Sequence, residues 1–300
     1  MSPLPESVDV REVGPRDGLQ PERPVPPEAR ARLVEALVDA GVRHLEAAAF
    51  VSPKAVPAMA GGAEVFAMVE RRPGVVYAAL VPNVRGAEMA LAAGADELTV
   101  TISASEAYNR RNVRMSVEES VAVVAAIGEL AGGVPVDAVV SCGFGSPYEG
   151  DLDPAAVAGL GERLLAGGAT TLTYADTTGM ATPRRVADLL DRTGPDVGLH
   201  LHDTRGTALV NAYEAMARGV RRFDTSVAGL GGSPFAAGAT GNLATEELVA
   251  VLDDLGVRTG IDVEALVEVA RSVADLVGHP VPSRVAAAGP RSWLAAEATA

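Results

Sequence analysis

The sequence predicts an α/β fold, a (β/α)₈ TIM barrel with a C-terminal helical extension. Three observations predict it. Eight short β-rich runs alternate strictly with longer segments of helical periodicity. Several helical segments end at a glycine that leads directly into the next run. The 300 residues, 48% of them hydrophobic, exceed the roughly 250 that one such barrel uses.

The eight β-rich runs are expected to be parallel strands, because each is followed by a segment long enough for a crossover helix. A doubly wound open sheet is the alternative, but it would more often show fewer units and a glycine-rich phosphate fingerprint after the first strand. The predicted strands are Val8–Val13, His44–Phe50, Val75–Leu80, Glu97–Ile102, Val134–Cys142, Thr170–Ala175, Val197–His202 and Arg222–Val227.

The segments between these runs carry apolar residues at i, i+3 and i+4, the spacing of one helix face. Gly41, Gly94, Gly168 and Gly219 stand at or near the ends of four of them, where glycine tolerates a left-handed backbone. The predicted helices are Glu28–Ala40, Gly62–Arg71, Gly86–Ala93, Val117–Leu130, Pro154–Ala166, Pro183–Arg192, Leu209–Arg218 and Thr245–Leu255.

No low-complexity linker divides the chain, so we expect residues 1–300 to form a single domain. The barrel is expected at about residues 8–258. Further helices, broken by Pro280 and Pro282, are expected at about residues 262–297, with fraying from Ala295.

The net charge of −14, from 25 basic and 39 acidic residues, argues against nucleic acid or membrane surfaces as partners. A phosphate-bearing ligand would therefore require a local concentration of arginine. Cys142 is the single cysteine, which excludes an intrachain disulfide. The N-terminus lacks a secretory signal and no run of 18 apolar residues occurs, so a cytoplasmic protein is expected.

His200 and His202 stand two positions apart in the seventh predicted strand, so their side chains project from one face. In a barrel that face is the lumen, and active sites lie at the carboxyl ends of the strands. Two imidazoles with oxygen ligands from Asp17 and Asn242 would suit a divalent metal ion. A pair of buried, hydrogen-bonded histidines is the alternative. Because two of only four histidines share this face, the pattern favours a metal site.

Arg16 and Asp17 follow the first predicted strand, between Gly14 and Gly18, which let the backbone bend. One interpretation gives Asp17 to the metal and Arg16 to a developing oxyanion or carboxylate. The other is a surface ion pair in a turn, and the residues alone leave the two open.

Two further features are weaker signals. The glycine-rich segment from Gly229 to Gly241 could provide hinges for a lid over the substrate. The other two histidines, His44 and His279, have no comparable company and are expected to be structural.

Several motifs resemble the 3-hydroxy-3-methylglutaryl-CoA lyases, which are DRE-type TIM metallolyases. The resemblance covers residues from about 8 to 287. The motifs that carry it are Gly14-Pro15-Arg16-Asp17-Gly18-Leu19-Gln20, Phe50-Val51-Ser52-Pro53-Lys54, Tyr148-Glu149-Gly150, Asp176-Thr177, Leu201-His202-Asp203-Thr204, Ser226-Val227-Ala228-Gly229-Leu230-Gly231-Gly232 and Gly241-Asn242-Leu243-Ala244-Thr245-Glu246.

This resemblance implies cleavage of a 3-hydroxy-3-methyl acyl-CoA into acetyl-CoA and a ketoacid, as in leucine degradation, with Mg²⁺ or Mn²⁺ as cofactor. It also implies an acyl-CoA substrate as partner and a possible homodimer. The implied metal ligands are Asp17, His200, His202 and Asn242; the implied catalytic residues are Arg16, Glu46, His200 and Ser233; and the expected substrate contacts are Gln20, Ala49, Thr173 and Thr177.

Two departures from the family pattern bear on the chemistry. The lyases carry a catalytic cysteine where this chain has Ser233, and a hydroxyl is far less acidic than a thiol, whose pKa is about 8.5. His200, Glu46 or a metal-bound water would then carry the proton, or the reaction differs. Residues 47–49 are alanines where the lyases carry hydroxyl groups, which indicates a less polar or differently shaped acyl pocket. Cys142 is expected to be a small core or pocket residue.

Two other functions stay open beside the lyase. One is a condensing relative of the citramalate or isopropylmalate synthase type, although those enzymes use longer chains with a regulatory domain. The other is a catalytically silent homologue that binds metal or acyl-CoA, which only Ser233 favours. Arg16, Asp17 and Glu46 argue against it, because a binding protein has no need of all three.

Overall fold

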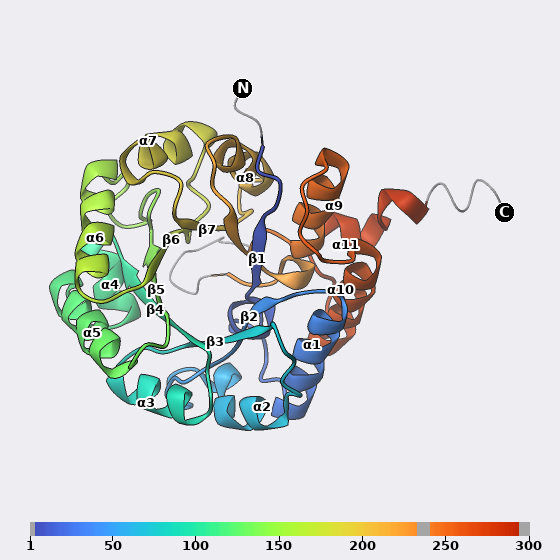
Figure 1. The fold of residues 1–300 in the computed structure, drawn as a ribbon, viewed down its shortest axis with the longest axis horizontal. Coiled ribbons are helices and arrows are strands. Elements are labelled where there is room, and N and C mark those ends of the chain that lie inside the picture. The colour runs from blue at the N-terminus through green and yellow to red at the C-terminus, as the bar shows by residue number, and fades with distance from the viewer. Residues whose placement is uncertain (1–3, 233–240, 294–300) are drawn as a thin grey trace.

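The computed structural model describes residues 4–232 and 241–293, in which eight parallel strands close a barrel in chain order (Figure 1). The closed order confirms the predicted TIM barrel and excludes the open doubly wound sheet. Every predicted strand is present within a few residues of its predicted ends. The strands are β1 (Asp9–Glu12), β2 (His44–Ala49), β3 (Val76–Leu80), β4 (Glu97–Ser103), β5 (Val136–Ser141), β6 (Thr171–Asp176), β7 (Gly198–Leu201) and β8 (Arg222–Thr225).

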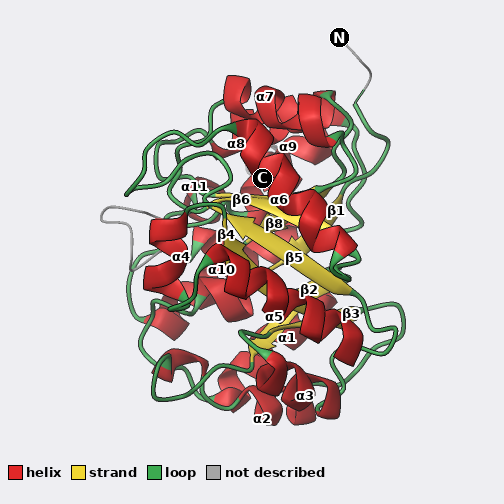
Figure 2. Ribbon diagram, turned by 90° about the vertical axis from the view of Figure 1, so that its left-hand side faces the viewer, coloured by secondary structure: helices red, strands yellow, loops and turns green. Residues whose placement is uncertain are grey.

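Helices surround the strands on all sides, as the side view shows (Figure 2). No helix in the two described ranges has both the length and the apolar character needed to span a membrane. The helices are α1 (Pro27–Asp39), α2 (Gly62–Met68), α3 (Val84–Ala92), α4 (Glu106–Asn112), α5 (Val117–Leu130), α6 (Pro154–Ala166), α7 (Pro183–Thr193), α8 (Ala208–Ala217), α9 (Thr245–Leu255), α10 (Val263–Val277) and α11 (Arg284–Ala288).

Helix α4, directly after β4, is the one barrel-side helix that the periodicity did not predict. It has only seven residues and an almost entirely polar sequence, so it has no apolar stripe to recognise. The hydroxyl of Ser105 caps it by accepting a hydrogen bond from the backbone N–H of Tyr108. The predicted C-terminal extension begins with α10, which packs beside α1, and the Asp262 N–H donates to the Ala40 carbonyl at 2.8 Å.

The strands are buried on both faces, as expected of a parallel barrel whose outer face is covered by helices. Strand β2 carries an irregularity between Glu46 and Ala48 in its pairing with β3. A bulge at a barrel rim redirects the side chains that follow it. This irregularity lies where Glu46 enters the candidate site.

The bend predicted after β1 is a single π-helical turn, η1 (Gly14–Gly18). Backbone N–H groups of Arg16, Asp17 and Gly18 all donate to the Val13 carbonyl, at 2.7–3.2 Å. This turn presents two adjacent polar side chains at the carboxyl end of the barrel.

The buried Glu12 ties that turn to the segment after β8. Its Oε1 accepts hydrogen bonds from the N–H groups of Gly14 and Val227, at 2.7 and 2.9 Å, and its Oε2 accepts from the Thr245 hydroxyl at 2.5 Å. Burial raises the pKa of Glu12 to about 7, even though these three donors oppose the rise.

Candidate active site

Asp17, His200 and His202 meet at the carboxyl end of the barrel. The two imidazole Nε2 atoms lie 3.1 Å apart, and Nε2 of His200 lies 3.9 Å from Oδ2 of Asp17. These three residues form the one group of three potential metal ligands found in the described part of the chain. The structure thus brings together, from η1 and from β7 with the residue that follows it, side chains that stand more than 180 positions apart in sequence.

Asn242 completes the set. Residues His202 and Asn242 pair through an isolated antiparallel bridge, and the Asn242 Nδ2 group donates to Oδ2 of Asp17 at 2.8 Å and to the Leu230 carbonyl at 3.0 Å. Its Oδ1 is buried without a hydrogen-bond partner in residues 4–232 and 241–293. An oxygen so placed is available as a ligand, because an unsatisfied buried acceptor is costly.

The residues present fit a divalent cation. Two ligand atoms that each lie about 2.1 Å from a metal ion, at right angles to each other, are about 3 Å apart. The distance of 3.1 Å between the Nε2 atoms of His200 and His202 matches this value. Burial raises the pKa of Asp17, but the charges of Arg16 and the two histidines outweigh it and hold that pKa below its usual range. Asp17 is therefore a carboxylate near neutral pH, as a metal ligand must be.

Arg16 is buried and not part of a surface pair, which decides between the two interpretations of the turn. Its Nε and Nη2 atoms both lie near Oε2 of Glu46, the Nε contact measuring 2.6 Å, and its Nη1 donates to Oδ1 of Asp17 at 2.7 Å. Oε1 of Glu46 is buried and has no partner in the described ranges. The arrangement places a fixed positive charge and an unpaired, buried carboxylate oxygen beside the potential metal ligands.

Asp176, the last residue of β6, was not among the predicted site residues. Its Oδ1 accepts from the N–H groups of Met180 and Ala181, whereas its Oδ2 is buried and without a partner in the residues described. Burial raises the pKa of Asp176 to about 6. Its place at the carboxyl end of a strand, as for His202, was the signal that could have selected it.

Three arginines gather where α4 follows β4, at the same end of the barrel. They are Arg110, Arg111 and Arg114, and the Arg111 guanidinium lies over the Tyr148 ring at 4.3 Å from its centroid. This is the kind of local arginine concentration that an anionic ligand would need in a protein of net charge −14.

The family model described as HMGL-like matches residues 7–273. The chain is also 43% identical to the 3-hydroxy-3-isohexenylglutaryl-CoA/hydroxymethylglutaryl-CoA lyase of Pseudomonas aeruginosa, over 95% of this chain and 98% of that protein. The chain belongs to the hydroxymethylglutaryl-CoA lyase family. The mitochondrial hydroxymethylglutaryl-CoA lyase of Mus musculus is 42% identical, over 96% of this chain and 91% of that protein.

Solved structures agree with this lyase assignment. A lyase from Acenitobacter baumannii, in complex with coenzyme A and 3-methylmalate, superposes with a TM-score of 0.91 at 41% identity, covering 97% of this chain and 98% of that one. The lyase from Pseudomonas aeruginosa gives 0.91 at 42% identity, covering 98% and 99%. The resemblance stated from the motifs is thereby confirmed.

The four predicted substrate contacts differ in burial and in their depth in the barrel. Ala49 is buried at the end of β2, and Gln20 is partly exposed just after η1. The Thr177 hydroxyl accepts from the Cys142 N–H at 3.0 Å. Thr173 lies lower in the barrel, level with Gly198 of β7, and donates to Oδ2 of Asp137 at 2.9 Å. These four roles stay predictions.

Ser233 and the glycine-rich lid fall partly outside the described residues. The prediction for Ser233 lies wholly there, as does most of the proposed lid. On the near side of that segment Gly231 has φ +120°, and a Cβ there would lie 2.5 Å from Nδ2 of Asn242. Glycine at 231 therefore leaves room for the Asn242 amide.

The remaining histidines and the cysteine have contacts typical of structural residues. His44 Nε2 lies 3.0 Å from Oε1 of Glu97, and the exposed His279 contacts Glu22 at 2.9 Å. Cys142 is buried, and burial raises the pKa of its thiol to about 12. A thiol with so high a pKa is a poor substitute for the family's catalytic cysteine.

Proposed function

We propose that this protein is a divalent-metal-dependent lyase that cleaves 3-hydroxy-3-methylglutaryl-CoA, or a related 3-hydroxyacyl-CoA, into acetyl-CoA and a ketoacid. The observation that carries the proposal is the cluster of Asp17, His200 and His202, whose potential ligand atoms lie close together. Asn242 is hydrogen-bonded to Asp17 and keeps a buried Oδ1 unpaired in the described structure, and Arg16 lies beside Asp17. The relatives' names supply the substrate class, and the chain has the side chains that such a reaction requires.

Asp17, His200, His202 and Asn242 would hold the metal ion, with Mg²⁺ or Mn²⁺ preferred because half of the set is oxygen. When bound, such an ion supplies Lewis acidity that makes ionisation of a substrate hydroxyl easier near neutral pH. Arg16 lies against Asp17 and Glu46, so its guanidinium can stabilise negative charge that develops on a neighbouring substrate oxygen.

The reaction needs one proton removed and one delivered. A base takes the proton of the C3 hydroxyl, the C2–C3 bond breaks as the C3 oxygen becomes a ketone, and the electron pair moves to C2, where the thioester carbonyl stabilises it. C2 then takes a proton and acetyl-CoA leaves. Glu46 and Asp176 each keep one buried oxygen unpaired in the described structure, so both are candidates for these transfers. Because its pKa is raised to about 6, Asp176 can either take up or donate a proton near neutral pH.

The coenzyme A portion is proposed to lie toward α4. Arg110 and Arg111 of this helix, with the following Arg114, would pair with its phosphates. The relative from Acenitobacter baumannii is a complex with coenzyme A, which supports a coenzyme A site on this fold.

A substrate with a larger 3-alkyl branch is a second candidate. The relative from Pseudomonas aeruginosa is named for an isohexenyl as well as a methyl substrate. Here Ala49 is small and buried at the end of β2, near Glu46. Apolar walls of small residues favour an apolar substituent.

One assay tests the proposal. The protein is incubated with Mg²⁺ or Mn²⁺ and 3-hydroxy-3-methylglutaryl-CoA, and acetyl-CoA release is followed, with the isohexenyl analogue in parallel. Release that EDTA abolishes is the expected result. No release from the wild type, with restoration in Ser233→Cys, would assign the defect to the missing thiol. No release in either form would overturn the substrate assignment.

The same assay bears on the alternatives. Acetyl-CoA consumption with a ketoacid, in excess of cleavage, would identify a condensing enzyme, and metal or acyl-CoA binding without turnover would identify a silent homologue. The cytoplasmic location, the place in leucine degradation and the homodimer stay predictions.

A further inference from the structure

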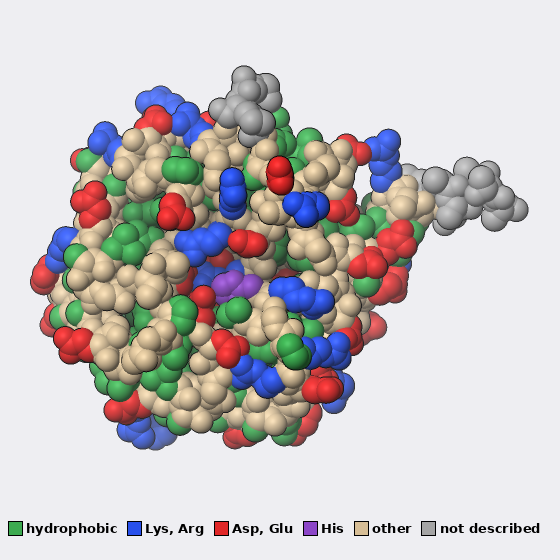
Figure 3. Space-filling view, in the orientation of Figure 1, with side chains coloured by type: hydrophobic (Ala, Val, Ile, Leu, Met, Phe, Trp, Pro, Cys, Tyr) green, Lys and Arg blue, Asp and Glu red, His purple; other side chains and the backbone are tan. Residues whose placement is uncertain are grey.

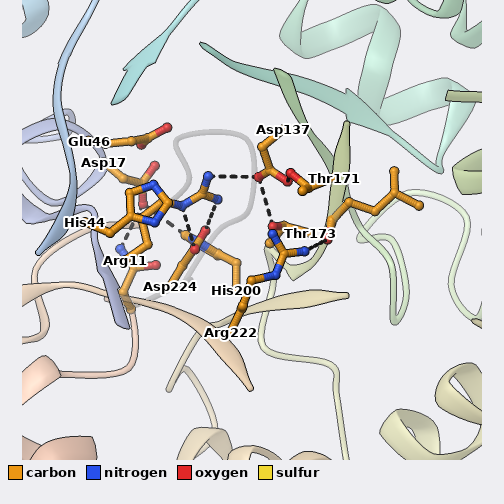
Figure 4. Close-up of polar contacts among 12 residues, drawn as sticks. Arg11, Asp17, His44, Glu46, Asp137, Thr171, Thr173, His200, Arg222 and Asp224 are labelled. Atoms are coloured by element: carbon orange, nitrogen blue, oxygen red, sulfur yellow. Dashed lines mark hydrogen bonds and ion pairs between the residues drawn. The ribbon is translucent and has the colours of Figure 1, made fainter. Parts of the chain in front are cut away.

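A buried charge network lies below the candidate metal site, at the amino-terminal half of the barrel. Its centre is Arg11 of β1, whose Nε and Nη2 donate to the two carboxylate oxygens of Asp224, both at 2.8 Å. The Arg11 Nη1 lies 2.9 Å from Oδ2 of Asp137 and 3.1 Å from Oε1 of Glu97. Figure 4 shows the guanidinium between strands from opposite sides of the barrel. The two-pronged pairing with Asp224 fixes that carboxylate in both position and rotation.

Asp224 connects this network to the metal site. Its Oδ2, already bound by Arg11, lies 3.2 Å from Nδ1 of His200. The other ring nitrogen of His200, Nε2, points to His202 and Asp17. A carboxylate that accepts a hydrogen bond from Nδ1–H keeps the proton on Nδ1 and leaves the Nε2 lone pair free toward those residues.

The network also lines a cavity that opens among the first residues of several strands. Arg11 and Asp224 line a cavity of about 240 Å³ together with residues from the starts of β1, β2 and β8, such as Asp9, His44 and Arg222. The space-filling view shows a histidine and several charged side chains in the central hollow of one face (Figure 3). Because Asp224 contacts His200 directly, we expect a change at Asp224 or Arg11 to reach the metal site through that ring.

We propose that Asp224 is a positioning residue that fixes His200 as its Nδ1–H tautomer with Nε2 available as a ligand, and that Arg11 holds Asp224 in place for this task. The inference rests on the proposed metal site. Nδ1 of His200 meets Asp224 alone in the contacts of the described residues, so the direction of that one hydrogen bond decides the tautomer.

The substitution Asp224→Asn tests the proposal because it keeps the shape and removes one acceptor. Three N–H groups, two from Arg11 and one from His200, now converge on the carboxylate. The asparagine amide has one acceptor oxygen and one NH₂ group in place of the two carboxylate oxygens. In either orientation the NH₂ group must therefore face an N–H donor. With the oxygen toward Nη2 of Arg11 and His200, the amide keeps the wild-type tautomer, and its NH₂ meets Nε of Arg11. With the oxygen toward Nε, the NH₂ meets Nη2 of Arg11 and also faces Nδ1 of His200, which moves the ring proton to Nε2, a tautomer error known to inactivate a histidine without unfolding the protein.

Two readouts are measured for the wild type and the variant. Histidine side-chain ¹H–¹⁵N correlation spectra of the metal-free protein report the tautomer of each ring. They are recorded at an alkaline pH, chosen by titration so that all four imidazoles are neutral, because, although burial opposes the rise, Asp224 and Asp17 raise the pKa of His200. Only four histidines need assignment. Calorimetric titration with Mn²⁺ reports metal affinity. We expect the Nδ1–H form of His200 in the wild type, a measurable Nε2–H population of this ring in Asp224→Asn, and about 10- to 100-fold weaker Mn²⁺ binding in the variant.

Asp137→Asn is the matched control, because Asp137 contacts the same Arg11 but the structure gives it no bond to His200. It should keep the wild-type tautomer and bind Mn²⁺ within about threefold. Equal weakening in both variants, or an Nε2–H tautomer in the wild type, would overturn the proposal. If Asp224→Asn fails to fold, the wild-type spectrum still decides the tautomer. Absence of Mn²⁺ binding in the wild type would instead refute the metal site, while the spectra continue to test the role of Asp224.

Discussion

The two ends of this barrel differ in how their buried carboxylate and amide groups are paired. At the carboxyl end, Asn242, Glu46 and Asp176 each leave one buried side-chain oxygen without a partner in the described structure. At the amino end, the guanidinium of Arg11 contacts three carboxylates through three of its nitrogens. At the carboxyl end some buried acceptors are therefore unpaired, whereas at the amino end the buried charges are paired with one another.

This difference distinguishes a reactive site from a supporting one. Unpaired buried acceptors cost stability unless a ligand, metal or water satisfies them. The three carboxylate and amide oxygens left unpaired at the carboxyl end therefore indicate where a ligand binds. A satisfied buried network fixes geometry instead. Asp224 belongs to the supporting end, yet through His200 it determines the geometry of the reactive one.

The largest effect is expected from removing a proposed metal ligand. His202→Ala should weaken Mn²⁺ binding by more than about 100-fold, beyond the range for indirect contacts, and abolish acetyl-CoA release with it. Calorimetry and the cleavage assay measure both. Undiminished metal binding would show that the carboxyl end holds its unpaired atoms for some other ligand.

Asp176→Asn should lower kcat by about 10²–10⁴-fold, the contribution of one acid or base, with Mn²⁺ affinity unchanged. Asn keeps an acceptor for the N–H groups of Met180 and Ala181, so the loop should stay in place. Rates at saturating substrate and a calorimetric titration separate the two quantities. A wild-type kcat would remove Asp176 from the reaction.

Arg11→Met should lower the free energy of unfolding by about 3–5 kcal/mol, because it leaves buried carboxylates without their shared cation. Urea unfolding at neutral pH measures the change. In Asp224, burial opposes ionisation, but the charge of Arg11 outweighs it and holds the pKa well below its usual range. Loss of less than about 1 kcal/mol would mean that the amino end is not the supporting end described above.

The smallest expected effect concerns the pH dependence of Glu12, which links η1 to the segment after β8. Its pKa is raised to about 7 in the folded protein from 4.5. Between these values the unfolded chain has lost the proton that the folded chain keeps, so this group lowers stability as pH rises through the interval. Glu12→Gln cannot titrate. The difference in free energy of unfolding, variant minus wild type, should therefore rise by roughly 1–3 kcal/mol from pH 4.5 to pH 7. Urea unfolding at both pH values measures it. The same difference at both pH values would contradict the raised pKa of Glu12.

Most of the fold could be predicted because its signals are local. Strand and helix periodicity placed all eight strands, and Thr245–Leu255 was predicted to its exact ends. Helix α4 was not predicted because its sequence is short and polar. The site was predicted in part: the period-two spacing put His200 and His202 on one face, whereas Asp176 was not selected although it ends a strand. Nothing local marked Glu12, whose importance comes from burial.

By itself the sequence determined the alternation of strands and helices, the number that closes a barrel, and the placing of His200 and His202 on one strand face. Only the tertiary structure decided which charges meet. Arg11 and Asp224 stand 213 positions apart and become neighbours because β1 pairs with β8 when the barrel closes. Local patterns encode backbone period and helix ends, whereas the choice of partner for a buried charge depends on closure, which no short stretch of sequence contains.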